Sequence, residues 1–380
     1  MLFSQSIGVV ALATLSTALP ERKTLAEREV GKLPALGWNG WNQGQCNAAS
    51  EKVALDTAKT FIRLGLKDAG YQYVNIDDCW STKQRDSKGN LVPDPKKWPR
   101  GIKPVVDEIH NMGLKFGLYG DRGVKTCAGY PGKCYTGNAA DIQTCPDDKG
   151  PSSRPGYELM RDMLRNTGKD ILYSLCNWGW DEVWTWGASV GHMWRMSVDN
   201  WGKWEDVVRI ANQAAPILKY TQPGRYNDLD MMILANGALT PAEERTHFAI
   251  WAITKSPIIL GTDMTKINSD EVKLITNKGL LAINQDPLSK PAVPFTPPGT
   301  PTKGNGEIYP YWSGPLSSGT VVAIVASKGN LDTKLSLSQV PGLKDQDYSW
   351  TEMLTGAKGR GRTVQAKLEK HDIAVFRIDN

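Results

Sequence analysis

Histidine is scarce in this chain, and the common metal-binding patterns are missing. Only four of the 380 residues are histidines, and the six cysteines form no Cys-x-x-Cys pair. No His-Glu-x-x-His motif occurs either. Zinc sites in proteins need clustered ligands of these types. We therefore expect no metal and no other cofactor.

The sequence also lacks long runs of one kind of residue. Its net charge of +5, from 45 basic and 40 acidic residues, is spread without basic blocks, which gives no case for nucleic-acid binding. An apolar stretch at residues 7–15 is too short to span a membrane, and no later candidate follows. No Gly-rich phosphate loop occurs, so a phosphate-binding enzyme has little support.

The N-terminus has the outline of an export signal. The apolar stretch is followed by Ser16, Thr17 and Ala18, so residues 1–18 are typical of a signal peptide cut after Ala18, although no Lys or Arg precedes the stretch. Residues 19–32 are charged and are expected to be a leader or linker. An even number of cysteines in an exported chain favours disulfides. We predict a secreted, extracellular protein.

Tryptophan is abundant, with 14 residues, and one of them follows an unusual acidic pair. The run from Tyr71 to Ile76 resembles a strand, and Asp77 and Asp78 end it just before Trp80. Adjacent carboxylates repel each other and do not help a core. At the end of a strand they can accept hydrogen bonds from a polyhydroxylated ligand, beside an aromatic wall. On this feature alone, a plain turn is an equal alternative.

Apolar runs that alternate with helical periodicity predict a parallel α/β fold. The expected strands are Ala35–Trp38, Tyr73–Ile76, Lys115–Tyr119, Ile171–Leu175, Met193–Ser197, Arg225–Met231 and Ile258–Leu260. Polar residues follow these strands, namely Asp77, Asp78, Asp121, Asn177, Asp199, Asp228 and Asp230. A (β/α)8 barrel has its active site at the C-terminal ends of its strands, so we predict such a TIM-like barrel at residues 33–289.

Helices are expected between these strands. Ala54, Ala58 and Ile62 share one helical face, and Thr240 opens a capping box with Pro241 at the first helical position. A further helix is expected to begin at Asn268 and to end near Gly279.

A second region follows a Pro-rich linker at residues 290–306. Short apolar runs separated by turns predict an antiparallel β-sandwich at residues 307–380. These runs are Ile308–Trp312, Thr320–Ala326, Lys334–Leu337, Tyr348–Met353, Thr363–Leu368 and Ile373–Ile378.

Six sequence blocks follow one another along the chain: Ala35-Leu36-Gly37-Trp38-Asn39-Gly40-Trp41-Asn42, Asp77-Asp78-Cys79-Trp80, Gly117-Leu118-Tyr119-Gly120-Asp121, Lys125-Thr126-Cys127-Ala128-Gly129, Asn227-Asp228-Leu229-Asp230-Met231 and Asn284-Gln285-Asp286-Pro287. In this order they resemble glycoside hydrolase family 27, the melibiase-type α-galactosidases. Their sequences are most similar to those of the fungal secreted members. The likeness covers residues 33–287, and the tail is similar to the C-terminal β-domain of the family.

The resemblance implies a retaining mechanism. One Asp attacks the anomeric carbon, and a second protonates the leaving oxygen and then activates water. Asp199 matches the acid/base, Arg195 matches the positioning arginine, and Val198 stands where the family usually has Gly. The implied substrate carries terminal α-D-galactose, as in galacto-oligosaccharides or galactomannan.

The resemblance also implies a set of substrate-binding residues. Carboxylates, an amide and aromatic walls make up this set, which is Trp38, Asp77, Asp78, Tyr119, Asn177, Arg195 and Asp230. Asn177 occupies the selectivity position, where we expect no enlarged pocket for an N-acetyl group. Cys46–Cys79 and Cys127–Cys134 match family disulfides, whereas the pairing of Cys145 and Cys176 stays open.

The nucleophile is not found. The family carries it on the fourth strand, in a Lys-Tyr-Asp type of sequence ahead of Asp-x-Cys, but here Gly132 meets Lys133 and Cys134 directly. The segment from Asp121 to Lys169, between the strands on either side of the gap, has about 49 residues. Two strand–helix units of a barrel need about 62. The only local carboxylates, Asp141, Asp147 and Asp148, follow no apolar run. A helix 3–strand 4 segment is therefore expected to be missing, and a helical pattern around Tyr157 follows the gap.

Three hypotheses follow. The chain is an α-galactosidase by ancestry, a non-catalytic galactose-binding protein on the same barrel, or the product of a gene model that drops an exon of an active enzyme. Single residues also have simpler readings: Trp38 and Tyr119 as core aromatics, Asp199 as the N-cap of a helix near Trp204, and Asp228 as a structural carboxylate. Linkage preference and oligomeric state stay open.

Overall fold

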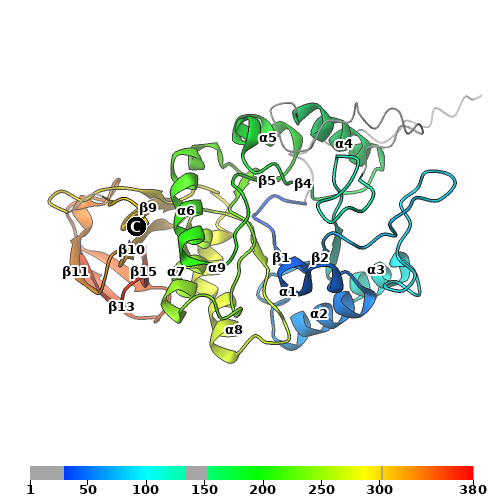
Figure 1. Cartoon of the computed structure of the whole chain (residues 1–380). Helices are drawn as coiled ribbons and strands as arrows, with labels where there is room; N and C mark the ends of the chain where they lie inside the picture. The colour runs from blue at the N-terminus through cyan, green and yellow to red at the C-terminus, as the bar shows by residue number, and fades with distance from the viewer. Residues whose placement is uncertain (1–29, 133–152, 301–302, 380) are drawn as a thin grey trace, which may run out of the picture.

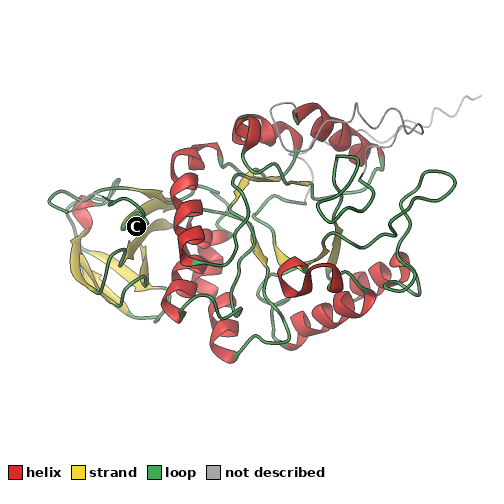
Figure 2. Cartoon of the chain, viewed as in Figure 1, coloured by secondary structure: helices red, strands yellow, loops and turns green. Residues whose placement is uncertain are grey.

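The computed structural model describes residues 30–132, 153–300 and 303–379 of the chain (Figure 1). The expected signal peptide, most of the leader, Cys134, Cys145 and the carboxylates of Asp141, Asp147 and Asp148 lie outside these residues. An α/β region forms the right part of the view in Figure 2, and a β region forms the left part.

Seven short parallel strands form the wall of a TIM-like barrel, and each lies where the sequence predicts one. They are β1 (Leu36–Asn39), β2 (Tyr73–Ile76), β3 (Lys115–Leu118), β4 (Ser174–Leu175), β5 (Met193–Arg195), β6 (Tyr226–Asp228) and β7 (Ile258–Leu260). The pairing order is β3-β2-β1-β7 in one sheet and β4-β5-β6 in the other. A parallel bridge between Met232 and Leu260 links the two sheets. All pairs are parallel, so the C-terminal ends of the strands meet at one face.

The barrel wall has a seam between β3 and β4. Within the described ranges no pairing joins these two strands, and β3 is the end strand of its sheet. Large apolar side chains near the seam are exposed to solvent, among them Leu118 on β3 and Leu159 and Met163 on the helix that precedes β4. An edge strand with unpaired backbone groups is a site where a further strand can add. The seam coincides with the position at which the sequence indicates a missing strand.

Helices surround the strands (Figure 2). They are α1 (Trp41–Gly44), α2 (Glu51–Arg63), α3 (Ile102–Asn111), α4 (Arg154–Asn166), α5 (Val183–Val190), α6 (Trp204–Ala214), α7 (Pro241–Ile253), α8 (Ser269–Ile275) and α9 (Lys278–Asn284). The capping box of α7 is present as predicted, because the Thr240 side chain accepts from the Glu243 N–H while the Glu243 carboxylate accepts from the Thr240 N–H.

Two details of the helices differ from expectation. Helix α8 begins after a capping box at Asn268, but it ends at Ile275, and Gly279 lies inside α9 instead of ending α8. The Asn277 side chain accepts from the Leu280 N–H and starts this new helix, a signal that the sequence offers equally well. On α2, Ala54 and Ala58 are buried but Ile62 is exposed, because Phe61 supplies the buried ring in that turn.

The C-terminal region is an antiparallel β-sandwich, as predicted. Its strands are β8 (Val293–Pro294), β9 (Tyr311–Leu316), β10 (Gly319–Val325), β11 (Leu331–Ser336), β12 (Tyr348–Glu352), β13 (Lys358–Gly361), β14 (Thr363–Leu368) and β15 (Ile373–Ile378). Six of them form the sheet β13-β12-β15-β10-β9-β8, and β11 pairs with β14. The sequence missed β13, which consists of two glycines and two basic residues, and β8, which pairs with β9 from within the Pro-rich segment.

The barrel and the sandwich share one hydrophobic core, which continues from Phe248 and Trp251 on α7 to Trp312 and Val375 in the sandwich. Polar contacts reinforce this interface, since Arg245 on α7 pairs with Asp372 at a distance of 2.8 Å. Among the described helices, none has both the length and the hydrophobicity that a membrane span requires.

Candidate functional site

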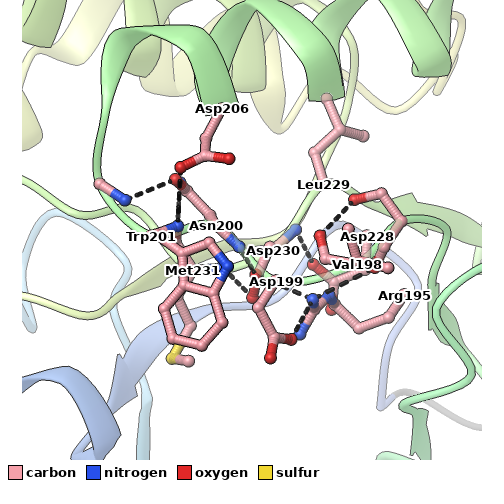
Figure 3. Close-up of polar contacts among 12 residues, drawn as sticks. Arg195, Val198, Asp199, Asn200, Trp201, Asp206, Asp228, Leu229, Asp230 and Met231 are labelled. Carbon is pink, nitrogen blue, oxygen red and sulfur yellow. Dashed lines mark hydrogen bonds and ion pairs between the residues drawn. The ribbon is translucent and has the colours of Figure 1, made fainter.

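The centre of the site is Arg195, the last residue of β5. Its Nη2 atom lies 2.8 Å from a carboxylate oxygen of Asp199 and 2.8 Å from one of Asp230 (Figure 3). These two carboxylates come from the loops after β5 and β6, which are neighbouring strands. The structure therefore brings together three of the residues that the sequence selects. It also excludes the simpler reading of Asp199, because the N-cap of α6 is Lys203.

Asp230 is the most constrained residue of the group. Its carboxylate accepts hydrogen bonds from the backbone N–H groups of Asn200 and Met231, both at 2.7 Å, in addition to the Arg195 ion pair. Its backbone φ of +80° is unusual for a residue other than glycine. The Trp251 indole donates to the Asp230 carbonyl at 2.8 Å and helps to hold this conformation. Such backbone strain is typical of functional sites.

Burial and neighbouring charges shift the pKa values of this group in opposite directions. Burial raises the pKa of Asp230, and it raises the pKa of Asp228 to about 6, while the Arg195 charge works against both shifts. Burial alone would lower the pKa of Arg195, but the carboxylates of Asp230, Asp228 and Asp199 outweigh it and leave the pKa above its usual range. Asp228 accepts from the Asp230 N–H at 2.9 Å, which fits its predicted structural role.

The acidic pair Asp77 and Asp78 lies at the end of β2, on the same face of the barrel. Asn39 at the end of β1 donates to the Asp77 carboxylate at 2.7 Å. Burial is the main cause that raises the pKa of Asp77, with smaller contributions from the neighbouring carboxylates. Asp78 is buried and accepts from the Ala128 N–H at 2.9 Å, so it also holds the loop that follows β3. The two carboxylates thus differ in role, since Asp77 keeps the more open position.

A disulfide fixes the chain just after this pair. Cys46 and Cys79 are bonded, which confirms one of the two pairings that the resemblance implies. Cys79 has a φ of +70°, and its bond ties the turn after Asp78 to the loop after β1. For the second pairing, Cys134 lies outside the described residues, so that pairing stays a prediction.

Aromatic residues border the acidic residues. Trp38 is fully buried and donates from Nε1 to the Thr262 carbonyl at 2.9 Å. Tyr119 is half-buried, and its hydroxyl donates to Asp121 at 3.2 Å. Burial, followed by the Asp121 charge, raises the pKa of Tyr119, so the hydroxyl stays a donor at neutral pH. Trp80 donates to the Tyr119 carbonyl and links the loops after β2 and β3.

Two buried polar atoms near the strand ends lack a partner among the described residues. Asn177, after β4, donates from Nδ2 to Ser153 Oγ at 2.7 Å, but its Oδ1 atom has no donor. The Nε–H group of Arg195, on the neighbouring β5, has no acceptor. Buried polar groups are nearly always hydrogen-bonded in folded proteins. These two atoms are available to a ligand with hydroxyl groups.

Comparison with known protein families agrees with this arrangement. Residues 33–286 match the family described as alpha galactosidase A, and residues 306–378 match the alpha galactosidase C-terminal beta sandwich domain. This chain belongs to glycoside hydrolase family 27.

Known members of the α-galactosidase family are similar over nearly the whole chain. A probable alpha-galactosidase B from Aspergillus clavatus is 38% identical and covers 88% of this chain and 85% of its own. A probable alpha-galactosidase B from Neosartorya fischeri is 36% identical over 434 aligned positions, with 96% of this chain and 97% of its own covered.

Solved structures of family members have the same architecture. Alpha-galactosidase I from Mortierella vinacea is 30% identical, with a TM-score of 0.81, and the match covers 93% of this chain and 98% of that one. The alpha-galactosidase of Saccharomyces cerevisiae is 28% identical, with a TM-score of 0.79 and coverage of 92% and 98%, and it has also been solved with raffinose.

Some supporting residues of this α-galactosidase-family site escaped the sequence analysis. Asn200 accepts from the Gly202 N–H and donates to the Met231 carbonyl, so it joins the loops after β5 and β6. Its place directly after Asp199 is a local signal. Trp251 gave no such signal, because it contacts Asp230 from the middle of α7, 21 residues away.

Proposed function

We propose that this chain binds terminal α-D-galactose at the face formed by Asp77, Asp78, Arg195 and Asp230, and that its 380-residue form does not hydrolyse galactosides by the retaining route. The observation that carries the proposal is the ion-paired group of Arg195, Asp199 and Asp230 beside the acidic pair, in a wall whose described strands β3 and β4 do not pair with each other. The proposed ligand is a galacto-oligosaccharide or galactomannan, and the protein that binds it is proposed to be secreted.

Galactose suits the chemistry of this face. Its hydroxyl groups can donate to the carboxylates of Asp77 and Asp78 and can use the free capacities of Asn177 Oδ1 and Arg195 Nε. Each of these atoms lies just beyond a barrel strand, where ligands of this fold bind. Asp199 is about one-third exposed, so it has access to a ligand while it pairs with Arg195. We propose that it occupies the acid/base position of the family, beside the glycosidic oxygen of a bound galactoside.

A retaining enzyme needs a second carboxylate about 5–5.5 Å from the acid/base. Asp230 is the candidate nearest to Asp199, because both have oxygens 2.8 Å from the same Arg195 nitrogen. However, Asp230 is only 3% exposed, and its carboxylate accepts two backbone N–H groups besides the ion pair. With three of its roughly four lone-pair sites occupied and little surface open, Asp230 is poorly placed to attack an anomeric carbon. Loss of the nucleophile removes the covalent route, whereas loss of one hydroxyl contact only weakens binding.

The alignment lengths support a missing segment. The Neosartorya protein aligns over 434 positions, whereas this chain has 380 residues, so at least 54 aligned positions face gaps in this chain. A gap of this size is long enough for one helix and one strand of a barrel. The elements on either side of the gap also expose large apolar side chains, namely Leu118 on β3 and Leu159 and Met163 on α4.

The same observation favours a second candidate, an active retaining α-galactosidase encoded by a longer transcript. Sequencing the transcript across codons 130–136 tests it. A retained segment that encodes an apolar strand ending in Lys-x-Asp would establish the longer enzyme. A transcript in which the codon for Lys133 directly follows the codon for Gly132 would favour the galactose-binding protein over the longer enzyme.

Two measurements on the purified chain test the proposal. Calorimetry is expected to detect galactose binding and no binding of glucose, and a chromogenic α-galactoside is expected to show no turnover. Asp77→Asn should weaken galactose binding, whereas Asp56→Asn, at an exposed residue that pairs only with Lys52, should not. Turnover by the 380-residue chain would refute the missing-nucleophile argument, and absence of galactose binding would refute the binding site.

A further inference from the structure

Three exposed apolar side chains lie on the loops next to Asp199. Trp201 is 72% exposed, Trp180 is 49% exposed and Val198 is 47% exposed. Trp201 and Val198 follow β5, and Trp180 follows β4, its neighbour in the sheet. Single exposed apolar residues are common on protein surfaces, but a cluster that contains two tryptophans at a binding face calls for a ligand or partner.

The backbone that presents Trp201 is held firmly. Asn200 before it donates to Asp230, and the Trp201 N–H donates to the Asp206 carboxylate at 3.2 Å. Gly202 after it donates to Asn200 at 2.9 Å. The indole itself takes part in no ring pair within the described residues. A fixed backbone with an unused aromatic face is a surface prepared for stacking.

The two loops are in direct contact. A Cβ atom placed on Gly179 would lie 2.5 Å from the Met196 carbonyl oxygen, so only glycine allows the loop after β4 to approach β5 this closely. Trp180 follows that glycine, and Val198 and Trp201 follow Met196 along the chain. The contact therefore brings the backbone just before Trp180 close to the end of β5, from which Val198 and Trp201 follow. Val198 adds a side chain where family members usually have none.

This surface adjoins the acid/base. In Figure 3 the Trp201 indole and the Asp199 carboxylate both point away from the helices, toward the same side. An acid/base must lie within hydrogen-bond reach of the glycosidic oxygen. The group attached to galactose begins at that oxygen, so it extends across residues beside Asp199. The apolar C–H face of a sugar ring stacks well on an indole.

We propose that Trp201, together with Val198 and Trp180, forms a binding surface for the sugar unit linked to the terminal galactose. The ligand class is therefore an α-galactoside whose second unit is a pyranose, rather than galactose alone. This inference rests on the proposed galactose site, since the stacked sugar is placed by the galactose next to it. Trp201 is a specificity-determining residue that contributes nothing to the contacts of galactose itself.

Calorimetry with galactose, methyl α-galactoside and raffinose, an α-galactoside of sucrose, tests the surface. The wild-type chain is expected to bind raffinose more tightly than methyl α-galactoside. Trp201→Ala should weaken raffinose binding about three- to tenfold and change methyl α-galactoside binding much less. Trp201→Phe, which keeps an aromatic ring, should restore most of the raffinose affinity. Leu159→Ala, at an exposed apolar residue on α4, is the matched control and should change neither.

The other outcomes overturn the inference in distinct ways. Equal wild-type affinity for raffinose and methyl α-galactoside would show that no second sugar is bound. An equal loss for both ligands in Trp201→Ala would make Trp201 a structural residue of the galactose site. A change from oligomer to monomer in Trp201→Ala, measured by sedimentation with sugar binding intact, would make the surface an interface between copies. Failure of the wild type to bind galactose at all would instead refute the underlying function.

Discussion

Replacing Arg195 by Met tests how much the buried ion pairs at the centre of the site contribute to stability. Arg195 is 8% exposed and Asp230 is 3% exposed. The substitution keeps an apolar stem of similar length but leaves the Asp230 carboxylate buried without its cation. Removing one partner of a buried pair costs about 3–5 kcal/mol. We assign this cost to Asp230, because the more exposed Asp199 can be solvated when the ion pair is lost.

The matched control is Arg154→Met on α4. Arg154 pairs with Glu158 one turn away at 2.8 Å, the same distance as in the site, but the two side chains are 49% and 32% exposed. Such a pair on a helix surface contributes about 0.3–0.5 kcal/mol. Urea unfolding monitored by tryptophan fluorescence should therefore separate the two variants clearly. In thermal unfolding, Arg195→Met should lower the midpoint by about 4–6 °C, because the unfolding entropy is about 2.1 cal/mol/K per residue.

A double variant distinguishes lost pairing from lost packing. Arg195→Met combined with Asp230→Asn removes both charges, so it should recover part of the stability that Arg195→Met loses, because no buried carboxylate is left unpaired. Galactose binding should be lost in both variants, since the positioning group is gone. A cost for Arg195→Met no larger than that for Arg154→Met would refute the reasoning, and so would a double variant that is less stable than Arg195→Met.

The remaining predictions concern buried groups away from the site. Burial lowers the pKa of Lys255 to about 8, so the folded state binds fewer protons than the unfolded state between pH 8 and 10.5. The unfolding free energy should therefore rise by roughly 3 kcal/mol across that window. Lys255→Met should abolish the rise. Neither ring nitrogen of His247 has a hydrogen-bond partner within the described ranges, and burial lowers the pKa of His247 to about 3. The unfolding free energy should therefore fall by about 1.4 kcal/mol per pH unit below pH 6.5. An equally steep fall of the unfolding free energy in His247→Leu would contradict this. Loss of the Cys46–Cys79 bond in Cys46→Ser should destabilise the chain by about 4 kcal/mol, since the bond joins residues 33 apart, and chemical denaturation of the oxidised wild type provides the reference.

Residue patterns carried most of the architecture. All seven barrel strands overlap the apolar runs that predict them, and β5, β6 and β7 are buried along their whole length. Strand β13 was missed because Lys358, Gly359, Arg360 and Gly361 have no such run, and its pairing depends on the partner strand β12. The end of α8 was misjudged because Asn277 begins α9 two residues before Gly279.

The sequence by itself determined the family, the order of strands and the identity of the candidate site residues, because these depend on short apolar and polar patterns along the chain. Only the tertiary structure decided which of those residues contact one another and which are exposed. It paired Arg195 with both Asp199 and Asp230, directed Asp78 to the backbone of Ala128, and left Trp201 exposed beside the acid/base. Contacts of this kind join loops after different strands, so no local pattern can encode them. The same holds for the seam between β3 and β4: the sequence shows a length deficit there, and in the described residues β3 and β4 each pair on one side only.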